Sequence, residues 1–280
     1  MIIWLASYPK SGNTFVRSLL SSYFFSQDGI FNFELLKNIK QFPANSLFKQ
    51  IGVDIENEKE MFKNYINIQK IINKKKDEIH FLKTHGSFVN QENFKFTDGY
   101  NTLGVIYIVR DPRNLITSYS HHFQLGIEKS FENLSTNQFL GKNTTRHCTT
   151  YLGTWKYHYN SWKIFEKYNR YLLIKYEDLV KDTRKTFIRI LEFISFLKRE
   201  KLVIDEKKFQ NTLLSTSFKK MQDLENKNDF FEAKEDLKTG KKIRFFNMGL
   251  RNDWKNLLDK NIKDEIEVSF KNEMKDLGYL

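Results

Sequence analysis

The chain has 280 residues, of which 40% are hydrophobic, so it can bury a sizeable core, and we expect a single domain over residues 1–280. Its only cysteine, Cys148, excludes an intramolecular disulfide and a cysteine zinc site, and it fits a reducing, cytoplasmic compartment. The formal net charge of +12 suits an anionic ligand, although a background bias toward Lys, Asn, Ile and Phe explains that charge equally well.

The first predicted element is a buried strand over residues 2–8, which leads through a polar turn into an amphipathic helix at about 13–25. The turn, residues 9–14, reads PKSGNT. Free backbone N–H groups and the positive end of the helix dipole make such a helix start an anion site. Gly12 allows close approach of a ligand, and further donors come from Lys10, Ser11, Asn13 and Thr14. We therefore predict a phosphate-binding turn, with an ordinary capped helix as the alternative.

Three more apolar runs predict strands, and amphipathic helices separate them. The strands are expected over 79–84, 103–109 and 171–175, and the helices at about 58–75, 113–125, 149–168 and 182–197. This alternation favours a parallel sheet covered by helices on both faces. Ligands of such sheets bind beyond the carboxyl ends of the strands.

Polar side chains follow each of these strands. Lys83 and His85 end the second strand, Arg110 ends the third with Ser118 two turns into the next helix, and Tyr176 follows the fourth. An imidazole at this edge suits a general base at neutral pH, and an arginine suits a phosphate. The plainer alternatives are a structural histidine and a surface arginine beside a capped helix. Because these polar side chains lie at the same edge of the sheet, we predict that they form one site.

Two segments of the last third add aromatic and basic groups. Thr216 and Phe218 lie at a helix start, where the ring either stacks on a nucleobase or belongs to an ordinary helix cap. Residues 244–256 form a basic, aromatic loop that contains Gly249 and Arg251 and leads into a last helix at about 254–277. The loop is either a lid that supplies cations to a phosphate or a solvated basic loop.

Together these segments resemble the nucleotide-dependent sulfotransferase family, in the same order and over nearly the whole chain. Residues 8–14 (YPKSGNT) are similar to the family's 5′-phosphosulfate loop, YPKSGTTW, and residues 83–85 (KTH) to the segment with the catalytic histidine. Arg110 with Ser118 resembles the 3′-phosphate pair. Three further segments resemble family motifs near the adenine and in the C-terminal loop, namely residues 176–178 (YED), 216–221 (TSFKKM) and 253–256 (DWKN).

The resemblance implies a P-loop-like, three-layer α/β fold with a central parallel sheet of about five strands. It also implies in-line transfer of a sulfuryl group from 3′-phosphoadenosine 5′-phosphosulfate (PAPS) to a hydroxyl or amine, without a metal. The implied catalytic residues are His85, as general base, Lys10 and Lys83. The implied donor-binding residues are Lys10, Ser11, Gly12, Asn13, Thr14, Phe15, Arg110, Ser118, Tyr176, Thr216, Phe218, Gly249 and Arg251.

The chain departs from the family pattern at three places, the last of them a pair of residues. Asn13 replaces a threonine, but its amide can still donate to a phosphate, and Phe15 replaces a tryptophan but keeps a ring. Asn247 and Met248 replace the arginine and lysine that precede Gly249, so two expected 3′-phosphate cations are missing. The candidates to substitute for them are Arg251, Arg244 and Lys242.

Other classes of protein remain open from the residues alone. A P-loop kinase or ATPase carries its lysine after the second glycine of the loop, whereas Lys10 precedes Gly12. A nucleotide binder that has lost its activity fits the missing cations. We expect no nucleic-acid partner, because no basic and aromatic motif of a known reader is present.

The acceptor and the assembly are less constrained. We expect a small alcohol or phenol, a glycan or a glycolipid headgroup as acceptor, bound with the help of residues 31–76 and 124–146. We expect no transmembrane segment, since no stretch approaches roughly 18 uninterrupted apolar residues, and we see no leader peptide. A homodimer is compatible with the sequence.

Overall fold

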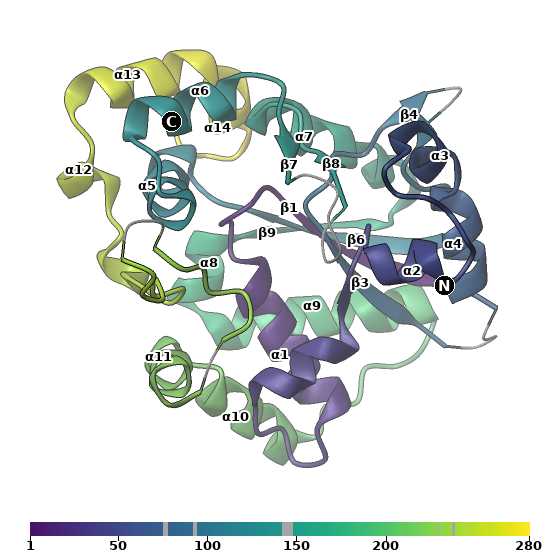
Figure 1. The fold of residues 1–280 in the computed structure, drawn as a ribbon. Helices are drawn as coiled ribbons and strands as arrows, with labels where there is room; N and C mark the ends of the chain where they lie inside the picture. The colour runs from purple at the N-terminus through teal and green to yellow at the C-terminus, as the bar shows by residue number, and fades with distance from the viewer. Residues whose placement is uncertain (75–77, 92–93, 142–147, 229, 237–238) are drawn as a thin grey trace.

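A computed structural model describes residues 1–74, 78–91, 94–141, 148–228, 230–236 and 239–280. Within this part of the chain, a five-stranded parallel sheet forms the middle layer, in the order β2-β3-β1-β6-β9 (Figure 1). The strands are β1 (Ile2–Ser7), β2 (Lys40–Gln41), β3 (His80–Thr84), β6 (Thr102–Val109) and β9 (Tyr171–Lys175). The predicted sheet is confirmed, and four strands lie within one residue of their expected bounds.

The fifth strand, β2, was not predicted. It consists of two polar residues, Lys40 and Gln41, which pair with Leu82 and Lys83 at the edge of the sheet. Such a short polar segment has no apolar pattern, and only its neighbour β3 makes it a strand.

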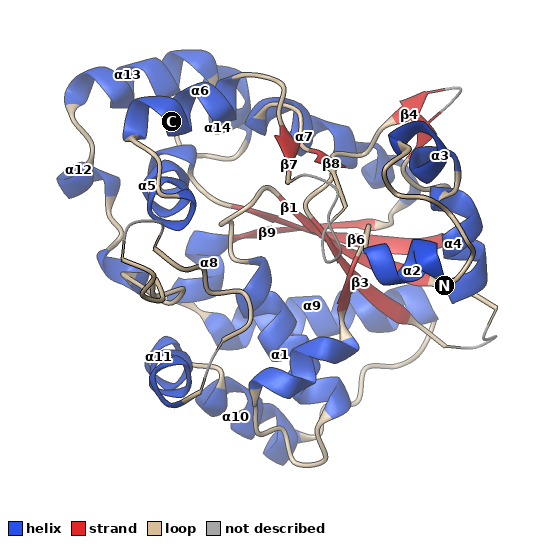
Figure 2. Cartoon of the chain, viewed as in Figure 1, coloured by secondary structure: helices blue, strands red, loops and turns tan. Residues whose placement is uncertain are grey.

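Each face of the sheet buries its own core, because successive side chains of a strand point to opposite faces. In β1, Ile2, Trp4 and Ala6 join one apolar cluster while Ile3 and Leu5 join the other, and all five are fully buried. Helices cover both faces, as Figure 2 shows. The first cluster is covered by α2 (Asn45–Lys49), α3 (Glu58–Lys63), α4 (Tyr65–Ile72), α5 (Pro112–Phe123), α6 (Ile127–Ser135), α7 (Trp155–Trp162), α13 (Lys260–Ser269) and α14 (Lys271–Asp276). The second is covered by α1 (Asn13–Phe25), α8 (Tyr176–Lys181), α9 (Thr183–Lys198) and α10 (Glu206–Ser215).

A third, smaller apolar cluster lies beside α1 and fixes the segment that follows α11 (Phe218–Lys227). Phe230 and Phe246 pack there against Phe33 of the 3₁₀ helix η1 (Phe33–Asn38). The remaining elements are η2 (Lys163–Tyr168), η3 (Gly249–Arg251), α12 (Trp254–Leu257) and the hairpins of β4 (Asn90–Gln91) with β5 (Phe94–Lys95) and of β7 (Phe139–Leu140) with β8 (Thr150–Tyr151).

Three predicted helices have the wrong extent, because residues inside them begin or end helices. The helix predicted over 58–75 divides at Asn64 into α3 and α4. The one predicted over 149–168 begins only at Trp155, after the strand β8 and the cap Thr154. The last one divides into α12, α13 and α14, since Asp259 accepts a hydrogen bond from the N–H of Ile262 and starts a new helix.

Of the helices in the described residues, none combines the length and the apolar character that crossing a membrane requires.

Candidate active site

The carboxyl ends of the strands open into a cleft of about 1350 Å³. It brings together segments that are far apart in the sequence, from the turn after β1 to the loop that precedes α12. Apart from Ser11, every predicted site residue lines it: Lys10, Gly12, Asn13, Thr14, Phe15, Lys83, His85, Arg110, Ser118, Tyr176, Thr216, Phe218, Gly249 and Arg251. The structure therefore supports the prediction of one site, while the role of each residue stays a prediction.

The turn after β1 has the backbone conformation of an anion-binding loop. Lys10 and Gly12 adopt positive φ angles of 70° and 106°, and the N–H of Ser11 bonds to the carbonyl of Tyr8. The first helical hydrogen bonds of α1 come from Phe15 and Val16, so the N–H groups just before them remain available for a ligand. Two features require glycine at position 12. One is the positive φ angle, and the other is that a Cβ atom there would lie 2.5 Å from the ring of Tyr176.

Asn13 acts differently from our expectation. Its side-chain amide donates to the carbonyl of Leu5 at 2.9 Å and to Ser7 Oγ at 3.1 Å. The amide therefore holds the turn against the end of β1 rather than pointing a donor at a phosphate. Sequence could not reveal this, since an asparagine at a helix start can bond either outward or back to its own strand.

Arg110 lies beside the turn and has hydrogen-bond donors that are not used within the described part of the chain. Its guanidinium lies 4.3 Å from the centre of the Tyr176 ring, and Nη1 donates to the carbonyl of Lys10 at 3.3 Å. Its Nε and the hydroxyl of Ser11 are buried and have no hydrogen-bond partner among the described residues. Buried polar atoms without partners cost about 1–3 kcal/mol each, so they favour an anionic ligand that supplies acceptors.

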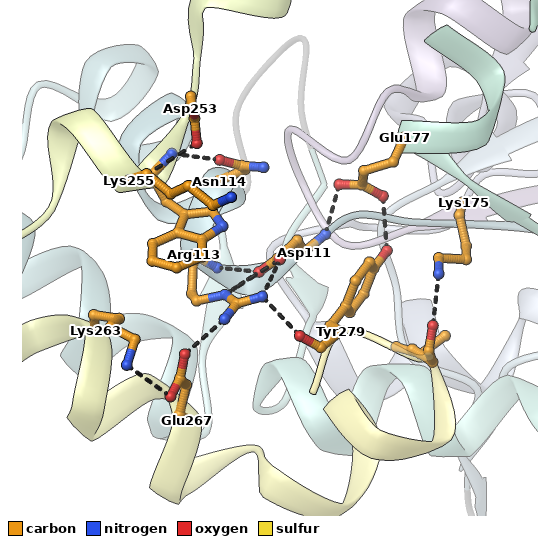
Figure 3. A network of polar contacts seen from close by, with 12 residues as sticks. Asp111, Arg113, Asn114, Lys175, Glu177, Asp253, Lys255, Lys263, Glu267 and Tyr279 are labelled. Carbon is orange, nitrogen blue, oxygen red and sulfur yellow. Dashed lines mark hydrogen bonds and ion pairs between the residues drawn. The ribbon is translucent and has the colours of Figure 1, made fainter. Parts of the chain in front are cut away.

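A polar network fixes the two strand ends that carry Arg110 and Tyr176 (Figure 3). Glu177 accepts from the N–H of Asp111 at 3.0 Å and from the hydroxyl of Tyr279 at 2.8 Å. Arg113 binds Asp111 at 2.7 Å and Glu267 at 2.6 Å, which ties α5 to α13. Asp111 also caps α5 by accepting a hydrogen bond from the N–H of Arg113. The acidic residues after Arg110 and Tyr176 are thus structural, and they hold those two residues side by side.

His85 presents one ring nitrogen toward the cleft. Its Nδ1 donates to the carbonyl of Ser7 at 2.8 Å, because a carbonyl can only accept, and this leaves Nε2 unprotonated. Burial, reinforced by the charge of Lys83, lowers the pKa of His85 to about 3. The imidazole is therefore neutral at physiological pH, as a general base must be before it acts.

A second histidine, which no sequence pattern singled out, supports the backbone of His85. His158 is fully buried, and its Nε2 donates to the carbonyl of His85 at 3.0 Å while its Nδ1 accepts from the hydroxyl of Tyr107 at 2.8 Å. Trp162 Nε1 donates to the next carbonyl, that of Gly86, at 3.0 Å. These bonds fix the position of His85 from behind.

The C-terminal loop reaches the cleft by docking on α5. Asn252 bonds to Thr117 and to the carbonyl of Asn114, next to Ser118. Gly249, with φ +57°, packs under the ring of Phe218, where a Cβ atom would lie 2.7 Å away. Of Arg251, Arg244 and Lys242, the candidates to replace the missing cations, Arg251 lines the cleft.

Lys10 lines the cleft and packs against an aromatic ring. Its ammonium group lies 3.7 Å from the centre of the Phe245 ring. Burial lowers the pKa of Lys10 to about 7, an effect that Glu232 opposes and Arg110 and Lys83 reinforce. Lys10 thus loses its charge close to neutral pH unless an anion binds.

Glu232 and Arg17 are further charged residues of the cleft that the sequence did not indicate. The Glu232 carboxylate accepts from Arg17 Nη1 at 2.6 Å, from Lys83 Nζ at 3.0 Å and from Thr14 Oγ1 at 3.0 Å. Burial alone would raise the pKa of Glu232, but Lys83 and Arg17 hold it well below its usual value. A carboxylate is thus bound at the turn where we expected a phosphate.

Apolar side chains also line the cleft. Pro43, Ala44 and Leu140 come from the two regions expected to help bind an acceptor, and Cys148 and Thr150 lie just after the second region. Residues 142–146 of the second region lie outside the described residues. In the described part of the chain, no group of three or more His, Cys, Asp or Glu side chains could hold a metal ion.

Comparison with known proteins gives consistent matches. A family model described as a sulfotransferase domain matches residues 2–278. Mouse sulfotransferase 1E1 is 24% identical over 97% of this chain and 83% of its own length. Rat sulfotransferase 2A1 is 31% identical over 54% of this chain and 50% of its own length.

Two solved structures share the fold. Mouse sulfotransferase SULT7A1, complexed with PAP, superposes with a TM-score of 0.61 at 20% identity, covering 99% of this chain and 86% of that one. A retinol dehydratase in complex with androsterone and the inactive cofactor PAP gives a TM-score of 0.62 at 18% identity, covering 98% and 81%.

Proposed function

This chain belongs to the sulfotransferase domain family, and we propose that it transfers a sulfuryl group from PAPS to a hydroxyl or amine of an acceptor. The observation that carries the proposal is the meeting of Lys10, His85, Arg110 and Phe218 in one cleft. The unpartnered Nε of Arg110, a residue that lines the cleft, fits a phosphate of such a nucleotide. We assign the turn at residues 10–14 to the 5′-phosphosulfate, Arg110 and Ser118 to the 3′-phosphate, and Phe218 to the base.

The proposed mechanism uses the geometry of His85. When bound, PAPS supplies a sulfuryl group activated by its bond to the 5′-phosphate. The acceptor oxygen or nitrogen forms a bond to sulfur while the bond from sulfur to the phosphate oxygen breaks, and the acceptor proton goes to His85 Nε2. Lys10, Lys83 and the backbone N–H groups of the turn stabilise the negative charge that grows on the phosphate. The negative charge of a donor also raises the pKa of His85 and makes it a stronger base.

A transfer assay tests the proposed function directly. The protein is incubated with PAPS that carries labelled sulfate and with a cell extract, and labelled products are identified. We expect label to pass to a molecule with a hydroxyl or amine group without added metal. When His85 is replaced with asparagine, this transfer should be slower by ~10²-fold or more. Absence of any transfer, together with tighter binding of ATP and magnesium than of PAPS, would favour a kinase or ATPase instead.

Donor affinity is expected to fall as the pH rises through the pKa of Lys10. Only the charged form of Lys10 attracts the phosphate, and its pKa lies at about 7 in the free protein. Binding of adenosine 3′,5′-bisphosphate (PAP), measured by calorimetry between about pH 6 and pH 9, should therefore weaken across this range. A Lys10→Arg variant keeps its charge throughout and should show a smaller decline. Equal slopes would contradict this role, because the ligand's own titration is common to both proteins.

Arg110→Ala is expected to weaken the binding of PAP by about 10- to 100-fold, since it removes a charged donor from the assigned 3′-phosphate site. Adenosine 5′-phosphosulfate lacks the 3′-phosphate and serves as the matched ligand. Its affinity, measured by the same titration, should be nearly the same for Arg110→Ala and for the unmodified protein. If both ligands lose affinity equally, Arg110 supports the turn and does not bind the 3′-phosphate.

A further inference from the structure

The Glu232 carboxylate binds at the turn in the way that an oxyanion ligand would. One oxygen accepts from both Arg17 and Lys83, and the other accepts from Thr14. The side chain of Glu232 is 17% exposed, and it lines the cleft. Two of its partners, Thr14 and Lys83, are residues that we assign to the donor's phosphosulfate or to its transfer.

The cationic partners of Glu232 extend from α1 and β3, two elements of the scaffold. Arg17 is 3% exposed, and its Nη2 donates to the carbonyls of Leu36 and Ile39, so the guanidinium is fixed by the backbone. Lys83 extends from β3 and is 6% exposed. Two nearly buried cations require an anion close by, because an unpaired buried charge is strongly destabilising.

Glu232 itself can leave by rotation of its side chain. Its neighbour Phe230 is anchored in the third apolar cluster, which keeps the backbone of this segment next to α1. The carboxylate stands at the end of a flexible side chain, so it can turn away while the segment stays docked. A second anion at the same three donors would repel the carboxylate, and the two therefore cannot share the site at close range.

We propose that Glu232 is an internal anion that occupies the sulfuryl end of the donor site and that PAPS displaces it from Thr14, Arg17 and Lys83. This inference rests on the proposed function. It identifies Arg17 as an additional donor to the sulfuryl group, and it makes the apparent affinity for PAPS depend on the fraction of molecules in which Glu232 has turned away. Before the donor arrives, Glu232 keeps the two cations paired.

The inference is tested with Glu232→Gln, which keeps the shape of the side chain and removes its charge. Glu235→Gln is the matched control, because Glu235 is an exposed carboxylate on the same segment outside the cleft. We expect Glu232→Gln to bind PAPS about tenfold or more tightly than the unmodified protein, and Glu235→Gln to bind it with unchanged affinity. Without ligand, Glu232→Gln should melt at a lower temperature, and PAPS should raise that temperature by more than it does in the control.

Sodium sulfate provides a probe that does not depend on the nucleotide. Sulfate should stabilise Glu232→Gln against heat more than it stabilises Glu235→Gln. Weaker or unchanged PAPS affinity in Glu232→Gln, or equal stabilisation of both variants by sulfate, would overturn the inference and leave the proposed function intact. If none of the proteins binds PAPS, the proposed function fails, and the sulfate series alone decides whether Glu232 occupies an oxyanion site.

Discussion

Replacing His85 with asparagine should lower the rate of sulfuryl transfer by ~10²-fold or more while leaving the affinity for PAP nearly unchanged. The asparagine amide can still donate to the carbonyl of Ser7, as His85 Nδ1 does at 2.8 Å, so the loop after β3 keeps its conformation. What the substitution removes is the unprotonated Nε2 that faces the cleft. The loss should therefore appear in kcat and not in donor binding.

The measurement pairs steady-state transfer kinetics with calorimetric titration of PAP, and His85→Ala serves as a second variant. The two variants should be similarly slow, since both lack the base. If His85→Asn retains most of the activity, the imidazole is not the base and acts only through its bond to Ser7. If either variant loses PAP affinity as strongly as it loses turnover, His85 is a structural residue of the donor site.

Gly12→Ala should be the most destabilising of the glycine substitutions at the site, with a loss of about 3 kcal/mol or more in the free energy of unfolding. Gly12 has a φ angle of 106°, which strains any residue with a side chain, and the new Cβ would lie 2.5 Å from the Tyr176 ring. Tyr176 also packs against Arg110, so a shift of the ring should disturb the donor site as well.

Two other glycines separate the causes of this loss. Gly52 also has a positive φ, of 70°, but a Cβ there would meet no atom within 4 Å, so Gly52→Ala measures backbone strain alone. Gly99 has neither feature, and its substitution should be nearly neutral. Thermal unfolding of the three variants should rank Gly12→Ala as the least stable and Gly99→Ala as the most stable. Equal losses at Gly12 and Gly52 would show that contact with Tyr176 contributes nothing.

The structure shows where the residues that depart from the family pattern in the C-terminal loop lie. Asn247 and Met248 line the cleft in place of the expected cations, and Arg251 lines it a few residues later. The same cleft holds Arg17 and Lys83, which bind Glu232. The positive charge of the site is thus distributed differently from the pattern that the resemblance implied, and much of it lies at the end that we assign to the phosphosulfate.

Local features of the sequence determined the sheet, the turn and the position of the cleft. The apolar residues of β1 alternate between two buried cores, Asp111 caps α5, and Gly12 adopts the conformation that glycine tolerates best. Each of these depends on residues close together along the chain, so periodicity and spacing suffice to predict them. The shared edge of parallel strands then places their polar ends in one cleft.

Only the tertiary structure decided which side chains complete the site. Glu232 meets Lys83 across 149 positions of sequence, and His158 supports His85 across 73. The Asn13 amide turned back to β1, and the polar residues 40–41 became a strand only because β3 offered hydrogen bonds. Contacts of this kind form only where the folded backbone brings distant residues together. Neither secondary-structure propensity nor spacing along the chain predicts which distant residues will meet.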